Sequence, residues 1–271
     1  MVLPTRNVAE TIGPILARVA LLNDRSGLID QVMLVDADST DGTGDIARAC
    51  GAEVNSENEL LPAFGPAQGK GDAMWRSLSV ARGDIVMFAD ADTNNFDEHF
   101  IYGTLGPLLA LPGLQFTKAA YRRPYTDGQQ SVIDGGGRVT ELMAKPLFNF
   151  FCPELTGFVQ PLAGEFAAYR DLLCGIPFLT GYGVELGIMV DVLRAVGLPA
   201  MAQVDLGARQ NRPPVAPGSH PDELGGAARD DPPGARAATR GLRVRKSAGQ
   251  AAPRVRHLLA RRGHRAGIAA R

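Results

Sequence analysis

Short strand-like stretches alternate with amphipathic stretches over the first 92 residues of the chain. The strand-like stretches are at residues 2–4, 31–36, 52–54 and 84–89. Apolar side chains recur at helical spacing in residues 11–22, 43–50 and 71–81. Strands and helices in alternation predict an α/β fold, with a doubly wound, mostly parallel sheet and binding loops at the carboxyl ends of its strands.

The pattern becomes less regular after residue 96 and changes character again after residue 211. Residues 116–121 predict a strand, and residues 139–151 and 183–195 predict helices, with glycine-rich loops between them. From Arg212 onward alanine, arginine, glycine and proline dominate and aromatic residues are absent. Such a segment buries too little apolar surface to offset its ordering entropy, so residues 212–271 are expected to form a disordered tail.

Composition narrows the class of protein. A chain of 271 residues can bury one sizeable core, and its net charge of −1 gives no reason to expect nucleic acid or an anionic membrane as partner. The three cysteines lie far apart without a Cys-x-x-Cys motif, which favours a reducing compartment over a disulfide framework. There is no stretch typical of a signal peptide or a membrane span, so we expect a soluble cytoplasmic protein.

The strongest local chemical signal is an Asp-x-Asp motif, Asp90 and Asp92, directly after a buried strand. A strand end would present both carboxylates at the ligand-binding edge of the sheet. Mg²⁺ and Mn²⁺ are hard cations that bind one or two protein carboxylates together with a substrate diphosphate. The motif therefore indicates a metal site, although the same residues are also typical of a turn that merely ends a strand.

Two further loops indicate nucleotide binding. The carboxylates of Asp36 and Asp38 follow another buried strand, where they could accept hydrogen bonds from ribose hydroxyls or a base N–H. The alternative is an N-cap for the helix that follows. In Gln68-Gly69-Lys70-Gly71, the glycines let the backbone approach a diphosphate that Lys70 can neutralise. Taken by itself, this string is better explained as a surface turn with a solvated lysine.

Glycine-rich helix starts mark a candidate acceptor site. Residues 135–137 are three glycines, and Arg138 and Thr140 follow them at the start of a predicted helix. Free helix N–H groups, a guanidinium and a hydroxyl suit a phosphate or carboxylate. Glu185 stands at another helix start beside two glycines, where it could orient an acceptor hydroxyl or act as a base. Complementing the helix dipole is the simpler interpretation of Glu185.

Taken in order, these segments resemble the glucosyl-3-phosphoglycerate synthases and their mannosyl relatives, which are retaining transferases of the A-type nucleotide-sugar fold. The resemblance spans residues 2 to about 211. It is carried by residues 3–7, 38–41, 69–71, 75–78, 82–86, 90–92, 121–124, 135–142, 160–165 and 181–185. It implies a Rossmann-like, mostly parallel sheet with flanking helices, in which residues 1–95 bind the nucleotide-sugar and residues 96–211 bind the acceptor.

The resemblance also implies a role for each matching residue. The residues expected to bind the donor are Pro4, Asn7, Asp36, Asp38, Lys70 and Asp90. The metal, Mg²⁺ or Mn²⁺, would be held by Asp92 with support from Asp90, and the acceptor by Gly137, Arg138 and Thr140. Asp92 and Glu185 are the expected catalytic residues, with Glu185 facing the sugar and the acceptor.

The expected function is transfer of glucose from UDP-glucose or GDP-glucose to 3-phosphoglycerate, giving glucosyl-3-phosphoglycerate with retention. A mannosyl or other hexosyl donor with another acceptor is an alternative, as is a catalytically impaired nucleotide-sugar-binding protein. A homodimer is left open.

The chain departs from the family pattern in four places. Val8 stands where the family usually has Glu, Ala37 where it often has Ser, and Asn211 where a metal-binding His is expected. The fourth departure is the tail beyond residue 211. One hypothesis is a single-nucleotide insertion near the codon of Arg212, which would make the tail a frame-shifted product. The other is an evolved basic arm for an acidic partner.

Overall fold

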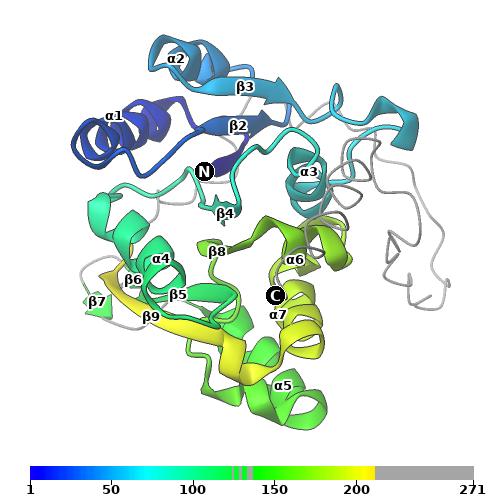
Figure 1. Ribbon diagram of the computed structural model, residues 1–271. Helices are drawn as coiled ribbons and strands as arrows, with labels where there is room; N and C mark the ends of the chain where they lie inside the picture. Colours follow the sequence, from blue (N-terminus) through cyan, green and yellow to red (C-terminus); the bar gives the residue numbers. More distant parts are fainter. Residues whose placement is uncertain (124, 128–129, 133–136, 211–271) are drawn as a thin grey trace, which may run out of the picture.

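The computed structural model describes residues 1–123, 125–127, 130–132 and 137–210. Its centre is a seven-stranded sheet with the strand order β3-β2-β1-β4-β8-β5-β9 (Figure 1). In that order the strands are Glu53–Ser56, Met33–Asp36, Val2–Thr5, Ile85–Phe88, Phe166–Tyr169, Phe116–Arg122 and Met201–Ala208. Neighbouring strands are parallel except beside β8, which runs antiparallel to both β4 and β5. The predicted mostly parallel α/β sheet is confirmed.

Helices cover both faces of this sheet (Figure 1). One layer consists of α1 (Ala9–Ser26), α2 (Thr43–Ala49) and α4 (Glu98–Ala110). The other consists of α3 (Lys70–Ser77), α5 (Lys145–Phe151), α6 (Arg170–Gly175) and α7 (Val184–Val196). Each layer has its own apolar core against the sheet, formed for example by Ile12 and Ile15 on the α1 side and by Met74 and Ile188 on the other. The amphipathic periodicity of the helices explains this burial.

The amino-terminal half matches the sequence expectation closely. Strands β1 to β4 all lie within or next to the predicted stretches, and α1, α2 and α3 occupy the predicted helical segments. The main difference is α1, which extends to Ser26 and ends at Gly27, whose φ of 59° is left-handed. The Gly27 amide donates to the Asn23 carbonyl over 2.8 Å, a closing turn that favours glycine.

The second half adds elements that the sequence pattern does not specify. Strands β8 and β9 complete the lower part of the sheet in Figure 1, and helix α4 packs against it. The predicted helix over residues 139–151 begins as a π-helical turn, Thr140–Ala144, before α5. Short 3₁₀ helices occur at Pro62–Phe64, Pro153–Gly157, Gly181–Gly183 and Leu198–Ala200.

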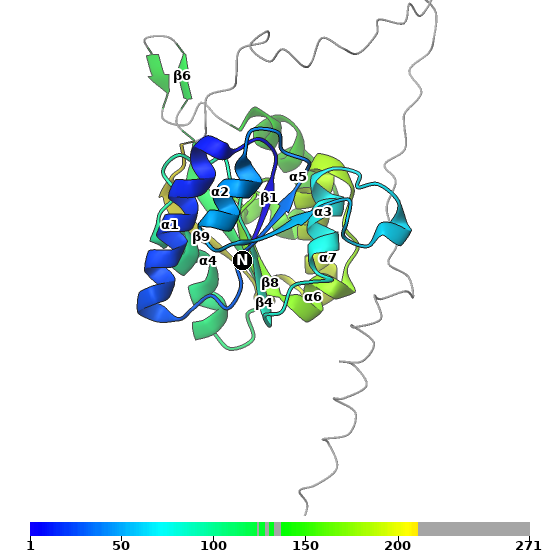
Figure 2. The ribbon, with the colours of Figure 1, turned by 90° about the horizontal axis from the view of Figure 1, so that it is seen from above.

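A separate hairpin projects from the body of the domain (Figure 2). Its strands, β6 (Tyr125–Asp127) and β7 (Gln130–Val132), pair antiparallel. No helix in the described part of the chain is long and apolar enough to cross a membrane. The predicted disordered tail, the frameshift hypothesis, Asn211 and the first two glycines of the 135–137 run all lie outside the described residues.

Candidate active site

A cavity of about 520 Å³ opens at the carboxyl ends of β1, β2 and β4. Four of the sequence-predicted site residues line it, namely Pro4, Lys70, Asp90 and Asp92. The walls also include Thr5, Arg6, Val8, Val35, Ala37, Glu57, Ala67, Gly69, Ala73, Ala91 and Tyr182. The parallel arrangement of the strands therefore brings side chains from distant parts of the sequence to one edge, as expected for a doubly wound sheet.

The first two binding loops are tied to each other by polar side chains. The Asp36 carboxylate accepts hydrogen bonds from the Thr5 hydroxyl over 2.9 Å and from the Ser39 hydroxyl over 2.6 Å. Asn7, whose φ of 52° is left-handed, accepts from the Thr40 amide through its side-chain oxygen. These bonds fix the loops after β1 and β2 as one rigid unit.

Three predicted donor residues do not line the cavity. Asp36 and Asn7 serve the loop scaffold, and Asp38 accepts from the Asn58 side-chain amide over 3.0 Å. The N-cap residue of α2 is Gly42, which makes no side-chain cap, but the Asp41 carboxylate accepts from the Thr43 amide over 3.0 Å at the start of this helix. The assignment of these three residues to donor binding stays a prediction.

Lys70 joins two segments that are 95 residues apart in the sequence. Its ammonium donates to Asp90 over 2.6 Å and to Glu185 over 2.7 Å. Glycines make this approach possible, because a Cβ on Gly71 would lie 1.8 Å from the Leu179 carbonyl oxygen and one on Gly69 would lie 3.3 Å from the Gly181 Cα. The two glycine-containing loops that the sequence singled out thus pack directly on each other.

Lys70 and Asp90 stabilise each other in their ionised forms. Burial alone would lower the pKa of the Lys70 ammonium, but the carboxylates of Asp90 and Glu185 raise it above its usual range. Burial would raise the pKa of Asp90, yet Lys70 and Arg209 outweigh burial and lower it. At neutral pH the pocket therefore carries the Lys70 cation against the Asp90 carboxylate.

Arg209 is a site residue that the sequence analysis missed. Its side chain is fully buried, and its guanidinium contacts Asp90 over 3.0 Å, Asp92 over 2.7 Å and Glu165 over 2.9 Å. The same guanidinium donates to the Tyr121 hydroxyl over 2.7 Å. Burial raises the pKa of the Glu165 carboxyl, and the adjacent Arg209 charge opposes that rise. Arg209 thus clamps both carboxylates of the Asp-x-Asp motif from the protein interior.

The turn over residues 160–165 packs directly against the Asp90 carboxylate. A Cβ on Gly164 would lie 2.2 Å from the Asp90 carboxylate, so only glycine permits the observed contact. Lys118, fully buried on β5, donates to the Ala163 carbonyl over 2.5 Å and lies 5.1 Å from the centre of the Phe166 ring. Burial lowers the pKa of the Lys118 ammonium to about 8.

The predicted acceptor residues form a separate group at the start of the π-helical turn. Gly137 has a left-handed φ of 93°, and a Cβ there would lie 3.9 Å from Thr140 and 4.0 Å from the Gln160 side-chain nitrogen. Thr140 is buried, whereas Arg138 is exposed. The Gln160 side-chain oxygen is buried without a hydrogen bond to any described residue. None of these residues lines the cavity.

Asp90 and Asp92 supply part of the oxygen ligand set that Mg²⁺ and Mn²⁺ require. The described residues contain no group of three or more His, Cys, Asp and Glu side chains arranged for a metal ion. They do offer two neighbouring carboxylates at the cavity wall, and the Asp92 side chain is 46% exposed. One or two carboxylates suffice when a diphosphate and water complete the coordination shell, so these residues fit such an ion.

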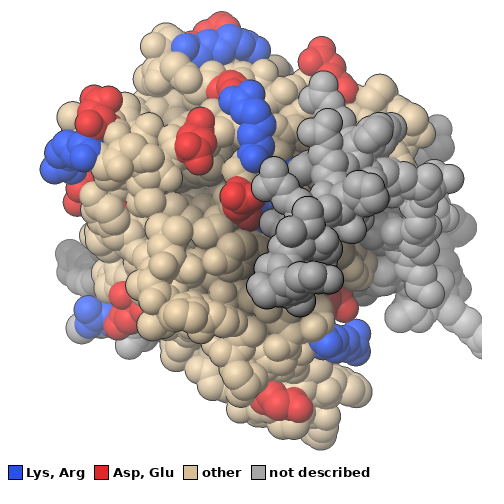
Figure 3. Space-filling model, viewed as in Figure 1, with Lys and Arg blue, Asp and Glu red and all other residues tan. Residues whose placement is uncertain are grey.

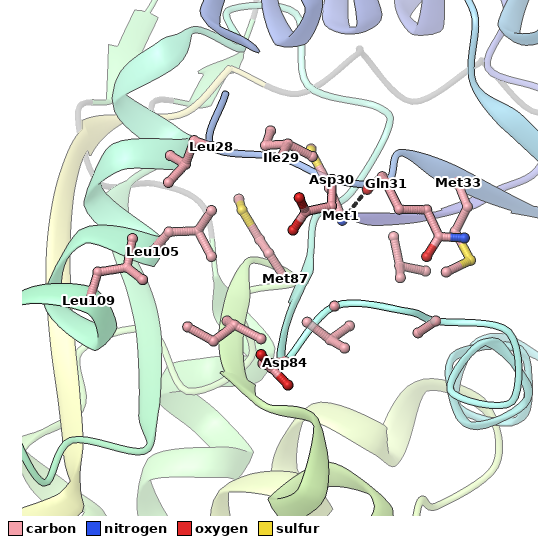
Figure 4. A pocket seen from close by; sticks show the side chains of 15 residues that line it. Met1, Leu28, Ile29, Asp30, Gln31, Met33, Asp84, Met87, Leu105 and Leu109 are labelled. Atoms are coloured by element: carbon pink, nitrogen blue, oxygen red, sulfur yellow. Dashed lines mark hydrogen bonds between the residues drawn. The ribbon is translucent and has the colours of Figure 1, made fainter. Parts of the chain in front are cut away.

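A second cavity lies at the opposite, amino-terminal edge of the sheet (Figure 4). It measures about 230 Å³, and Leu105 and Leu109 of α4 project toward it from one side. The Met1 amine, whose pKa burial lowers to about 6, donates to the Gln31 carbonyl there over 2.7 Å. This cavity shares no residue with the Asp-x-Asp cluster, so the chemistry belongs to the carboxyl edge.

Comparison with known proteins identifies the family. Residues 1–113 match Glycosyl transferase family 2. The chain is 45% identical over 215 residues to glucosyl-3-phosphoglycerate synthase of Mycolicibacterium paratuberculosis, covering 78% of this chain and 65% of that protein. The enzyme of Mycobacterium tuberculosis is 44% identical over 234 residues, covering 84% of this chain and 69% of that protein. The chain belongs to the glucosyl-3-phosphoglycerate synthase family.

Solved structures agree with this membership of the glucosyl-3-phosphoglycerate synthase family. Mannosyl-3-phosphoglycerate synthase from Rubrobacter xylanophilus is 64% identical, with a TM-score of 0.73 over 78% of this chain and 66% of that chain. The M. tuberculosis glucosyl-3-phosphoglycerate synthase in complex with Mn²⁺, UDP-glucose and phosphoglyceric acid is 43% identical, with a TM-score of 0.69 over 78% and 70%. The chain thus spans about two thirds of the length of its relatives.

Two of the departures from the glucosyl-3-phosphoglycerate synthase pattern fall in the cavity wall. Val8 and Ala37 both line it, and Val8 is held by its amide, which donates to the Thr43 hydroxyl over 2.9 Å. An apolar and a small residue therefore stand where the family usually has a carboxylate and often has a hydroxyl. On the face of the molecule that Figure 3 shows, Lys and Arg side chains are interspersed with Asp and Glu side chains.

Proposed function

We propose that this chain transfers glucose from a nucleoside-diphosphate glucose to 3-phosphoglycerate with retention of configuration, as a cytoplasmic enzyme. The observation that carries the proposal is the convergence of Lys70, Asp90, Asp92 and Glu185 at one end of a cavity large enough for a nucleotide. Family membership supports the choice of reaction. Residues 1–95 would bind the donor and residues 96–211 the acceptor.

Each side chain has a task in this reaction. A divalent ion held by Asp92 and Asp90 would neutralise charge on the departing diphosphate. Lys70 is at the first residue of α3, where its ammonium and the free amides of the first helical turn both favour an anion. The cationic Lys70 would meet the donor diphosphate. Glu185, only 5% exposed, does not line the cavity itself but is bound to Lys70 behind the wall, from where it would orient an acceptor hydroxyl.

Acceptor binding is assigned to the group beside the π-helical turn. Arg138 is exposed and would supply the guanidinium for the phosphate or carboxylate of 3-phosphoglycerate. Buried Thr140 and the Gln160 side chain lie next to Gly137 and would complete the hydrogen bonds to the same anion. The acceptor then approaches the sugar from the side of Glu185.

A screen of donors and acceptors tests the proposal. The full chain would be incubated with Mn²⁺ and with UDP-glucose, GDP-glucose or GDP-mannose, each with 3-phosphoglycerate, and products identified by mass spectrometry. We expect a hexosyl-3-phosphoglycerate from a glucose donor. The 64% identity to a mannosyl-3-phosphoglycerate synthase favours mannosyl transfer as the second candidate. Tight donor binding without product from any pair would instead support a nucleotide-sugar-binding protein without turnover.

A further inference from the structure

The nucleotide base would lie at the far end of the cavity from the Asp-x-Asp motif. The sheet order β3-β2-β1-β4 places the residues that follow these strands in a row at the carboxyl edge. Asp90 and Asp92 follow β4, Ala37 follows β2, and Glu57 follows β3. Three strand spacings separate the ends of β4 and β3, about 14 Å. That is roughly the span from a diphosphate to the far edge of its base, a placement that rests on the proposed function.

Glu57 is the acidic residue that this end of the cavity presents. It lines the cavity, and its backbone amide is fixed by donating to the Asp36 carbonyl over 3.0 Å. Among the residues that the structure describes, the Glu57 carboxylate makes no hydrogen bond and no ion pair. By contrast, the carboxylates of Asp36 and Asp38 are already bound to loop residues and do not line the cavity.

The surroundings of Glu57 favour a ligand that donates hydrogen bonds. Burial and the nearby Asp38 carboxylate raise the pKa of the Glu57 carboxyl, while Arg76 and Arg6 act in the opposite direction. A partly buried carboxylate without a partner gains from N–H donors that replace its lost water. The adjoining walls, Val8 and Ala37, are apolar or small and leave room for a flat ring.

We propose that Glu57 reads the N–H edge of the donor's nucleobase and selects guanine over uracil. Guanine presents two neighbouring donors, N1–H and the N2 amino group, which match the two oxygens of one carboxylate. Uracil presents a single N3–H between two carbonyl oxygens, which a carboxylate repels. Adenine and cytosine place a ring acceptor beside their amino group and fit less well. Glu57 is therefore a specificity-determining residue of the donor site.

Substitution by glutamine distinguishes this role from a general effect of charge. The amide of Glu57→Gln offers one acceptor and one donor, which matches N3–H and a carbonyl of uracil and mismatches the guanine edge. Binding of GDP and of UDP would be measured by titration calorimetry with Mn²⁺ for the unaltered chain, Glu57→Gln and Glu57→Ala. Glu59→Gln is the matched control, because Glu59 is exposed on the same loop and does not line the cavity.

The unaltered chain should bind GDP more tightly than UDP. Glu57→Gln should weaken GDP about tenfold or more while UDP binding stays equal or improves, and Glu57→Ala should weaken GDP to a similar degree without weakening UDP, because it removes the repelling carboxylate. Glu59→Gln should change neither. An unaltered preference for UDP, or a GDP-to-UDP ratio that Glu57→Gln leaves unchanged, overturns the role of Glu57 alone. Failure of the unaltered chain to bind any nucleoside diphosphate overturns the proposed function as well.

Discussion

Replacing Arg209 by methionine should lower the free energy of unfolding by about 3–5 kcal/mol, the usual cost of removing one partner from a buried ion pair. The cost arises chiefly at Glu165, because both the Arg209 and Glu165 side chains are fully buried and lie 2.9 Å apart. Asp90 keeps its contact with Lys70, and Asp92 is 46% exposed, so water can solvate it. The substitution therefore leaves the buried Glu165 carboxylate without its ion-pair partner.

Equilibrium urea unfolding followed by circular dichroism measures this loss, with the slope against urea compared between variants. A matched second substitution separates charge from packing. In the double variant Arg209→Met with Glu165→Gln, the buried group is neutral, and the remaining penalty should fall to that of an unsatisfied amide, about 1–3 kcal/mol. Glu165→Gln alone should be mild, because Arg209 retains Asp90, Asp92 and Tyr121. The reasoning is refuted if Arg209→Met costs less than about 1 kcal/mol or if the double variant is no more stable than Arg209→Met.

Three further predictions concern the metal, the acceptor and a buried amine. Asp92→Ala, and excess chelator acting on the unaltered chain, should each abolish turnover, and activity that survives both excludes the metal role. Arg138→Ala should raise the KM for 3-phosphoglycerate about thirtyfold by removing a charge-assisted hydrogen bond, with donor binding unchanged; an equal loss of donor binding would show that the loop is misassigned. Burial lowers the pKa of Lys118 from 10.5 to about 8. Below pH 8 the ammonium is protonated in both the folded and the unfolded chain, and burying its charge lowers the free energy of unfolding. This cost disappears as the pH rises from 8 to 10.5, because the folded state then holds the neutral amine. The stability of Lys118→Met relative to the unaltered chain, measured by urea unfolding, should therefore decline by about 3 kcal/mol across that interval, whereas a difference independent of pH contradicts the pKa assignment.

The amino-terminal half of the fold could be predicted because its strands are compact runs that end in turn-forming or acidic residues. Helix α4 was harder to predict, since Gly103, Gly106 and Pro107 interrupt a segment whose buried positions are otherwise helical. The structure supplies a reason for Gly103, where a Cβ would lie 2.4 Å from the Leu206 side chain of β9. Any larger residue at position 103 would force the Leu206 side chain to move, and this contact depends on the tertiary fold rather than on local propensity.

In the candidate site, too, some residues could be predicted from short motifs, whereas others are brought there only by the tertiary fold. Asp90, Asp92, Lys70 and Glu185 are recognisable from short motifs, and the structure brings all four together. Arg209 is 117 residues from Asp92, and only the parallel pairing of β9 with β5 places it beneath the motif. Glu57 directly follows β3 in the structure, but the sequence pattern ended that strand at residue 54, so the position of Glu57 at a strand end could not be predicted. The roles assigned to these residues remain predictions.

Proton NMR of the reaction mixture in real time is the most direct measurement of glucosyl transfer with retention. The full chain would be mixed with Mn²⁺, 3-phosphoglycerate and the glucose donor whose nucleotide it binds most tightly. We predict that the anomeric signal of the donor is replaced by an α-linked glucosyl signal, as 3-phosphoglycerate is consumed in equal amount. A β-linked product, release of free glucose without loss of 3-phosphoglycerate, or an unchanged donor signal would contradict the proposed function.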